Sequence, residues 1–217
     1  MLPVFHISRL RFGTDGEGIT TLVGIFGCPN QCRYCINYSW FKTKPQNLSI
    51  RELYNLVAVD DIYFRVTGGG ITFGGGEPLL WSEQIVAFAQ LVNKKWTINI
   101  ETSLNVSWEN IEKLIPYVDA FIIDIKDMNE DIYLAYTGES GAQVRENIAQ
   151  LAKLIPQKIV VRIPFIPEFN TSEDIYRSRM AIENMGICRI DVFTYRKCST
   201  EWEKHPKNRR KGNKIDA

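Results

Sequence analysis

The sequence has few histidines, little net charge and no long apolar run. Each of these features argues against a class of protein. Its only two histidines, His6 and His205, lie far from the main group of cysteines along the chain. Because a structural zinc site normally needs four closed ligands, zinc binding is disfavoured. No apolar run approaches the roughly 20 residues that cross a bilayer, so a membrane protein is not expected.

Charge and composition indicate an ordinary globular domain. The 26 lysines and arginines are offset by 25 acidic residues, which gives no general reason to expect nucleic acid as a partner. Residues 1–10 lack the apolar core of a signal peptide, so we expect a cytoplasmic chain with reduced thiols. Hydrophobic residues form 45% of the 217 residues, which is enough for one buried core. We therefore expect a single, monomeric domain over residues 1–203.

A run of basic residues follows that domain. Residues 204–217 contain a set of six cationic side chains: Lys204, Lys207, Arg209, Arg210, Lys211 and Lys214. A basic terminal run is usually a solvated arm, so we expect a flexible tail. Docking of this tail to an acidic patch on a partner protein is the alternative.

Three of the five cysteines are concentrated in one short segment. Cys28, Cys32 and Cys35 follow the spacing Cys-x3-Cys-x2-Cys, and Tyr34 precedes the third. A [4Fe–4S] cluster has four irons that each need a ligand, so three thiolates can hold it and leave one iron open. The spacing therefore indicates a cluster with an open position for chemistry. The other two cysteines are expected to act as small buried hydrophobic residues: Cys188 and Cys198.

Apolar runs alternate with amphipathic segments along most of the chain. Strands are expected at residues 20–26, 71–73, 97–101, 120–125, 158–163 and 189–193. Helices are expected at 49–57, where Ser49 to Glu52 reads as a capping box, and at 82–94, 108–114, from 131, 142–154 and 172–185. Helical crossovers require a parallel sheet, and these strands are too few for a closed eight-stranded barrel. The expected fold is α/β, an open, partial (βα)6 TIM-like barrel.

Glycine-rich and polar groups follow these strands at the ends where parallel α/β proteins bind ligands. The glycines from Gly74 to Gly76, followed by Glu77, permit a backbone to approach a bound group closely. A tight turn without a ligand is the alternative. Glu101 and Thr102 end the next strand, and Glu101 with a second carboxylate could form a site for a hard cation.

Three charged residues lie on the two following strands. Asp124 and Lys126 alternate on one strand, so both point to the same face. They form either a structural ion pair or contacts to a ligand, because such charges are costly to bury alone. Arg162 lies among apolar residues and requires a carboxylate, for which Asp124 is a candidate.

These segments together resemble the radical S-adenosylmethionine (SAM) enzymes and, within them, the glycyl radical enzyme activating enzymes, typified by pyruvate formate-lyase activating enzyme. The resemblance is carried by the cysteine segment, by Phe73 to Leu79, by Asp-Ile-Lys ending at Lys126, and by Val161 to Pro167. The segment from Gly13 to Ile19 is also similar to the Asp-Gly-Pro-Gly-Ile segment of that family. The similarity runs in order along the chain and covers most of it.

The resemblance implies roles for particular residues. The three cysteines would hold a [4Fe–4S] cluster whose open iron binds the amine and carboxylate of SAM. Tyr34 matches the aromatic residue of the cluster loop, and Gly75, Gly76 and Glu77 would hold the amino group of SAM. The other residues implied at SAM, or at a monovalent cation near its carboxylate, are Glu101, Thr102, Asp124, Lys126 and Arg162. Lys126 is also implied in catalysis, and Asp15 is a candidate to hold the substrate loop.

The resemblance also implies an oxygen-sensitive activity. An electron from flavodoxin or ferredoxin would split SAM, and the 5′-deoxyadenosyl radical would remove the α-hydrogen of a glycine in a partner enzyme. One alternative is a radical SAM enzyme that modifies a peptide or a small molecule, as 7-carboxy-7-deazaguanine synthase does. A non-catalytic iron–sulfur or zinc protein is the alternative from another class.

Overall fold

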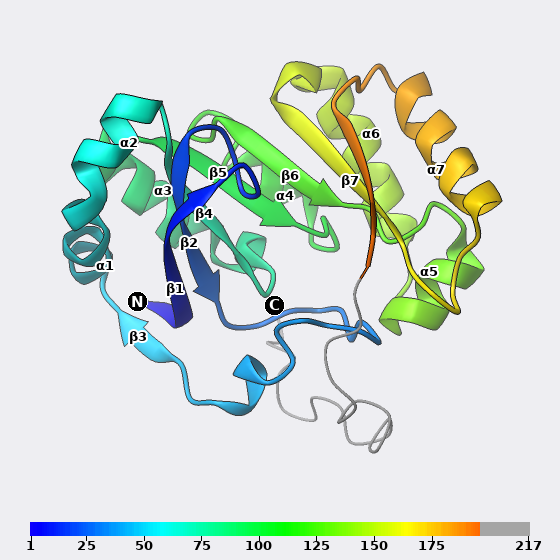
Figure 1. Ribbon diagram of the computed structural model, residues 1–217, viewed down its shortest axis with the longest axis horizontal. Coiled ribbons are helices and arrows are strands. Elements are labelled where there is room, and N and C mark those ends of the chain that lie inside the picture. Colours follow the sequence, from blue (N-terminus) through cyan, green and yellow to red (C-terminus); the bar gives the residue numbers. More distant parts are fainter. Residues whose placement is uncertain (196–217) are drawn as a thin grey trace.

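A curved sheet forms the centre of the computed structural model, which describes residues 1–195. Its order is β3-β1-β2-β4-β5-β6-β7-β8 (Figure 1). The strands expected from the sequence are β2 (Ile19–Ile25), β4 (Gly70–Gly75), β5 (Thr97–Thr102), β6 (Ala120–Asp124), β7 (Ile159–Phe165) and β8 (Ile190–Thr194). They run parallel in that order. The sheet ends at β3 and β8, so the prediction of an open, partial barrel is confirmed.

The sequence analysis missed two strands and one helix. β1 (Leu2–Phe12) and β3 (Gln46–Leu48) extend the sheet with antiparallel pairing, so the sheet has eight strands. β1 was hidden because a register shift between Ser8 and Arg11, with Leu10 at φ 54°, interrupts its alternation. The helix α2 (Asp61–Thr67) was missed because its β-branched and aromatic residues are typical of strands.

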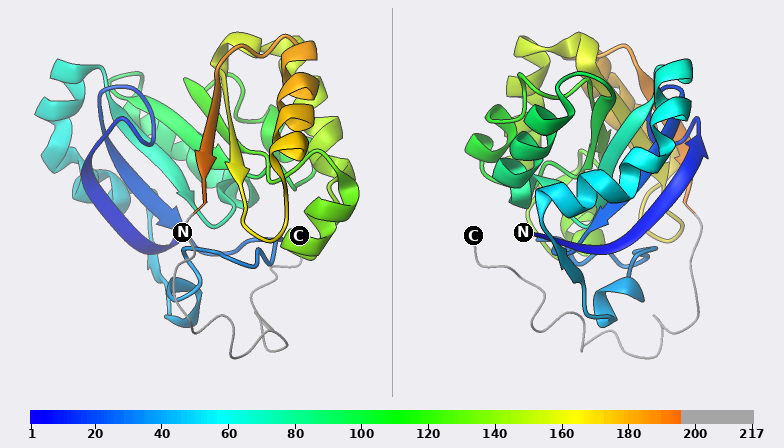
Figure 2. Two further views of the ribbon diagram at one scale, coloured as in Figure 1. Left: turned by 45° about the vertical axis from the view of Figure 1, so that its right-hand side comes forward. Right: turned by 90° about the vertical axis from the view of Figure 1, so that its left-hand side faces the viewer.

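Helices pack on the outer side of the sheet and leave its concave side for other groups (Figures 1 and 2). They are α1 (Ile50–Val57), α3 (Ser82–Val92), α4 (Trp108–Glu112), α5 (Glu130–Thr137), α6 (Ala142–Leu154) and α7 (Ser172–Asn184). Short 3-10 turns occur at Trp40–Lys42, Ala58–Asp60, Pro78–Trp81 and Pro156–Lys158. The capping box predicted before α1 is confirmed, because Ser49 and Glu52 exchange side-chain to backbone hydrogen bonds.

Strand alternation separates an apolar core from a polar interior. Phe73 points outward from β4 and packs edge-on against Phe88 of α3, with ring centroids 5.3 Å apart. Its neighbour Thr72 points inward, where its hydroxyl contacts Asn99 of β5. The hydrophobic core therefore lies between sheet and helices, and the polar side chains of the strands are directed into the barrel.

Two cysteine predictions have different outcomes. Cys188 is exposed, so the prediction that it is buried is wrong; it follows the turn at Gly186 and precedes β8 rather than packing under a helix. Cys198 lies outside the described residues, as does the basic segment 204–217. In the described part of the chain, no helix has the length and apolar character of a membrane span.

A buried asparagine fixes the loop that follows β5. The side-chain amide of Asn147, on α6, donates hydrogen bonds to the carbonyls of Leu104 and Val106, both at 2.8 Å. The loop turns at Leu104, whose φ of 58° is unfavourable for a leucine. Asn147 is fully buried, so its amide holds this strained loop in a region without water.

We predict that Asn147→Leu lowers the free energy of unfolding by about 2–4 kcal/mol, because two buried carbonyls lose their donor. Gln150→Leu is the matched control, since Gln150 is exposed on the same helix. Its effect should stay within about 0.5 kcal/mol. Urea unfolding of both variants measures the difference, and equal stability of the two would contradict the assignment.

Candidate active site

One cavity of about 310 Å³ opens at the carboxyl ends of the parallel strands. Most of the residues singled out from the sequence line it: Cys28, Cys32, Cys35, Gly75, Gly76, Glu101, Thr102, Asp124, Lys126 and Arg162. Tyr34 and Glu77 are absent from this lining. The fold therefore brings together side chains from five separate parts of the chain.

The end of helix α5 holds the cysteine loop. The backbone N–H groups of Gln31 and Arg33, on either side of Cys32, donate to the carbonyls of Thr137 and Tyr136, at 2.7 and 2.9 Å. These carbonyls lie in the last turn of α5, where a helix leaves its acceptors unsatisfied. The contact positions Cys32 from both sides.

Tyr34 packs behind this loop. Its ring meets those of Tyr136 and Phe169 edge-on, and its hydroxyl donates to Glu168 at 2.7 Å. It thus joins the cysteine loop to the segment after β7, outside the cavity lining.

The glycine-rich end of β4 presses against the start of the cysteine loop. The N–H of Glu77 donates to the carbonyl of Gly27 at 2.7 Å. A methyl group on Gly76 would lie 2.1 Å from that carbonyl oxygen, so only glycine fits there. Asn37 also holds the glycine-rich turn, because its side-chain amide donates a hydrogen bond to the carbonyl of Gly75 at 2.7 Å.

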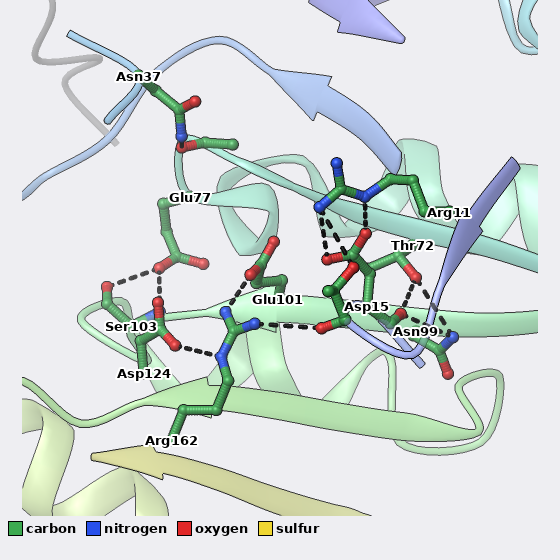
Figure 3. A network of polar contacts seen from close by, with 12 residues as sticks. Arg11, Asp15, Asn37, Thr72, Glu77, Asn99, Glu101, Ser103, Asp124 and Arg162 are labelled. Atoms are coloured by element: carbon green, nitrogen blue, oxygen red, sulfur yellow. Dashed lines mark hydrogen bonds and ion pairs between the residues drawn. The ribbon is translucent and has the colours of Figure 1, made fainter. Parts of the chain in front are cut away.

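The carboxylate of Glu77 is fully buried and faces the loop after β5. It accepts hydrogen bonds from the backbone and hydroxyl of Ser103 at 2.9 and 2.7 Å (Figure 3) and from the hydroxyl of Thr102 at 2.6 Å. A fourth donor is the N–H of Leu79 at 3.3 Å. Burial raises the pKa of Glu77, and these hydrogen bonds oppose the shift. The resemblance implies that Glu77 and the preceding glycines hold the amino group of SAM, and in the structure the carboxylate of Glu77 accepts from these four protein donors.

Four charged side chains form a network at the ends of β5, β6 and β7, and Figure 3 shows three of them, Glu101, Asp124 and Arg162. Arg162 donates to Asp124 at 2.6 Å and also pairs with Glu101. Lys126 lies 3.1 Å from the second oxygen of Asp124. Burial alone would raise the pKa of Asp124, but Lys126 and Arg162 hold it below its ordinary value. Asp124 and Lys126 were expected to form either a structural ion pair or contacts to a ligand. This geometry is compatible with both, because the ion pair itself lines the cavity.

The loop between β1 and β2 forms the floor of the cavity. Asp15 is buried there and pairs with Arg11 of β1. Its backbone carbonyl accepts from Thr72 and Asn99, which fixes the loop inside the barrel (Figure 3). The sequence analysis did not find Arg11, because β1 itself was missed.

Two other residues at the site also escaped the sequence analysis. Asn37 and Ser103 line the cavity and hold the glycine-rich turn and Glu77, respectively. Their only signal was their position, two residues after Cys35 and one after Thr102. Such single polar residues carry no pattern of their own.

Comparison with known proteins agrees with this geometry. The family model for the radical SAM superfamily matches residues 22–178. The (2S)-3-sulfopropanediol dehydratase activating enzyme of Klebsiella oxytoca is 35% identical, over 77% of this chain and 72% of that protein. This chain belongs to the radical SAM superfamily, in the family of glycyl radical enzyme activating enzymes. The pyruvate formate-lyase-activating enzyme of Clostridium pasteurianum is another relative, 28% identical over 83% of this chain and 77% of its own length.

Solved radical SAM structures share the fold. The SAM-bound crystal structure of SuiB from Streptococcus suis superposes with a TM-score of 0.64 over 81% of this chain, at 14% identity. This chain spans 40% of that protein. Coproporphyrinogen III oxidase of Escherichia coli gives a TM-score of 0.56 at 15% identity, over 90% of this chain and 50% of its own. The expected fold class is therefore confirmed.

Membership of the radical SAM superfamily implies a [4Fe–4S] cluster and SAM, and the three thiols that line the cavity fit the cluster. Within residues 1–195, no three His, Cys, Asp or Glu side chains converge on a single metal ion. In a [4Fe–4S] cluster each thiolate binds its own iron, so three thiols spread around one cavity suit a cluster better than one zinc ion.

We predict that Gly76→Ala disrupts the contact between the cysteine loop and β4. The added methyl group would collide with the carbonyl of Gly27, so the free energy of unfolding should fall by about 2–3 kcal/mol. Gly68→Ala is the comparison, because its φ of 71° strains an alanine but nothing lies within 4 Å. It should cost about 1 kcal/mol. Iron content after anaerobic reconstitution should fall only in Gly76→Ala, and equal iron in both variants would contradict the prediction.

A second prediction concerns the pH dependence of stability at Asp124. Its pKa in the folded protein is below the ordinary value of 3.8, so its ionised form stabilises the fold fully above that value. This stabilisation is lost as the pH falls through the lower, folded-state pKa. Asp124→Asn should lower the free energy of unfolding by about 2–3 kcal/mol at neutral pH, and the difference from wild type should shrink below pH 3.8.

Urea unfolding of the cluster-free protein between neutral pH and pH 3 measures this difference. Asp191→Asn is the control, because Asp191 is exposed on β8. A difference between wild type and Asp124→Asn that stays constant over the whole range would contradict the prediction.

Proposed function

We propose that this protein cleaves SAM reductively and uses the 5′-deoxyadenosyl radical to remove the α-hydrogen of a glycine in a partner enzyme, which becomes a glycyl radical enzyme. One observation carries the proposal. In a chain of the activating-enzyme family, the cysteine motif, the glycine-rich turn and the charged strand ends line a single cavity. When bound, the cluster supplies the electron and SAM supplies the radical.

Each wall of the cavity has its part in this proposal. Cys28, Cys32 and Cys35 hold the cluster, and Tyr34 supports their loop from behind. The backbone of Gly75 and Gly76 borders the cavity, so its peptide groups can meet the amino group of SAM. Glu77 keeps the turn and the Thr102 loop together from its buried position.

The charged wall supplies polar contacts to SAM. Lys126 and Arg162 present donors to carboxylate and ribose oxygens, while Glu101 and Asp124 accept from hydroxyl groups. Burial removes water from these groups, which strengthens their interactions and protects a radical from stray hydrogen donors. Lys126 lies 3.1 Å from Asp124 and borders the same cavity as the cysteines, so it also faces the reacting groups.

The partner loop enters from the open side of the sheet. The sheet ends at β3 and β8 without closing, and β1 and β8 lie toward the viewer in the left view of Figure 2. The target glycine has no side chain, so the activating enzyme can recognise it only through the backbone of the partner loop. The Asp15 carboxylate and the Arg11 guanidinium border the cavity floor and can accept from and donate to a peptide group. A flavodoxin or ferredoxin is the electron donor in this proposal, and the protein acts as a cytoplasmic monomer.

The proposal predicts two products that can be measured. After anaerobic reconstitution, dithionite and SAM should give 5′-deoxyadenosine. Addition of the cognate glycyl radical enzyme should give the doublet of a glycyl radical in electron paramagnetic resonance. Formation of 5′-deoxyadenosine with modification of a peptide or small molecule instead would contradict activation, and absence of 5′-deoxyadenosine would contradict radical SAM chemistry.

Cysteine variants make this test specific. Cys28→Ser should lower bound iron and abolish 5′-deoxyadenosine formation, because a hydroxyl is a poor ligand for this cluster. Cys188→Ser is the matched control, since Cys188 is exposed and absent from the cavity lining. Equal loss of iron in both variants would contradict the assignment of the cluster ligands.

A further inference from the structure

The oxygens that were expected to hold a monovalent cation are already occupied by donors of the protein. The expected ligands were Glu101, Thr102 and Asp124. Both oxygens of Asp124 accept side-chain donors, one from Arg162 at 2.6 Å (Figure 3) and the other from Lys126 at 3.1 Å. Each oxygen of Asp124 thus faces a cationic side chain, and the positive charge of these two groups opposes the approach of an inorganic cation.

Thr102 and Glu101 are engaged as well. The hydroxyl of Thr102 donates to Glu77 at 2.6 Å and accepts from the N–H of Leu104 at 2.9 Å. One oxygen of Glu101 accepts from Arg162 (Figure 3). The other oxygen faces the backbone of β4, where a methyl group on Gly74 would lie 2.6 Å away. The absence of a side chain at Gly74 therefore makes room for the full length of Glu101.

The charges in this network also balance. Two carboxylates, Glu101 and Asp124, face two cationic side chains, Arg162 and Lys126. An added inorganic cation would leave these half-buried side chains with excess positive charge, which is less well solvated there than at the surface. The residues present thus do not fit a monovalent cation.

We propose that the guanidinium of Arg162 takes the place of an inorganic cation in this enzyme, and that the length of Glu101 holds it there. The proposal rests on the function proposed above, because the site concerned is the SAM site. A guanidinium is permanently charged and planar, so it bridges two carboxylates with directed hydrogen bonds. Arg162 also donates to the carbonyl of Thr14 at 3.4 Å, which gives its fork a third acceptor.

A consequence is that SAM binding and cleavage do not depend on potassium or sodium ions. In wild type, the rate of 5′-deoxyadenosine formation in potassium chloride and in choline chloride should agree within about twofold at equal ionic strength, which holds screening constant. Stimulation of wild type by potassium or sodium beyond that range would overturn the proposal.

Glu101→Asp tests the role of side-chain length. The shorter carboxylate withdraws from Arg162 by one methylene and frees oxygens next to Asp124, so potassium should now raise the affinity for SAM about tenfold, a usual size for coupled ligands. Glu83→Asp is the matched control, since Glu83 makes an exposed ion pair with Lys113 on the outer surface. It should behave as wild type. Cation independence of Glu101→Asp would overturn the role given to Glu101.

A direct binding measurement separates this inference from the proposed function. Rubidium, a hard-ion surrogate for potassium that does not favour thiolates, is titrated into cluster-free protein, and its binding is followed by equilibrium dialysis. Wild type and Glu83→Asp should show no specific site, whereas Glu101→Asp should bind one ion. A site in wild type would overturn the inference even if SAM is cleaved, and its absence would support the inference even in a preparation that forms no 5′-deoxyadenosine.

Discussion

The close approach of the glycine-rich turn to the cysteine loop is the constraint on which the whole site depends. Gly76 lies against the carbonyl of Gly27, and the next residue donates a hydrogen bond to that carbonyl. This contact joins the ends of two neighbouring strands, β2 and β4. Because both ends are fixed to each other, the thiols and the turn share one cavity, and the buried Glu77 extends the same connection to the loop after β5.

The fold could be predicted from sequence wherever burial gave a simple pattern. The parallel strands from β4 to β8 are short apolar runs between helices, and the capping box of α1 was legible from Ser49 and Glu52 alone. β1 could not be predicted, because its pairing depends on β2 and β3 and on an irregularity near Leu10. α2 carries strand-like residues, and the surrounding structure decides its conformation.

The site, like the fold, could be predicted from the sequence only in part. Sequence placed Asp124, Lys126 and Arg162 on strands that end at the site, and alternation correctly directed Asp124 and Lys126 to one interior. It did not reveal that the Glu77 carboxylate turns toward Ser103, because that depends on a loop whose path is set by Asn147 on a distant helix. Local pattern therefore reports which strand end a residue occupies, while hydrogen-bond partners from elsewhere in the chain decide which way its side chain faces.

The attachment of the cysteine loop to helix α5 has a consequence for maturation. Gln31 and Arg33 bond to the end of that helix through the polypeptide alone, so these contacts of the loop do not depend on iron. The entropy of ordering this part of the loop is lost during folding rather than during cofactor assembly. A protein that delivers the cluster would therefore meet a cysteine loop that α5 already holds in part. Less of the free energy of cluster binding would then be lost in ordering the loop.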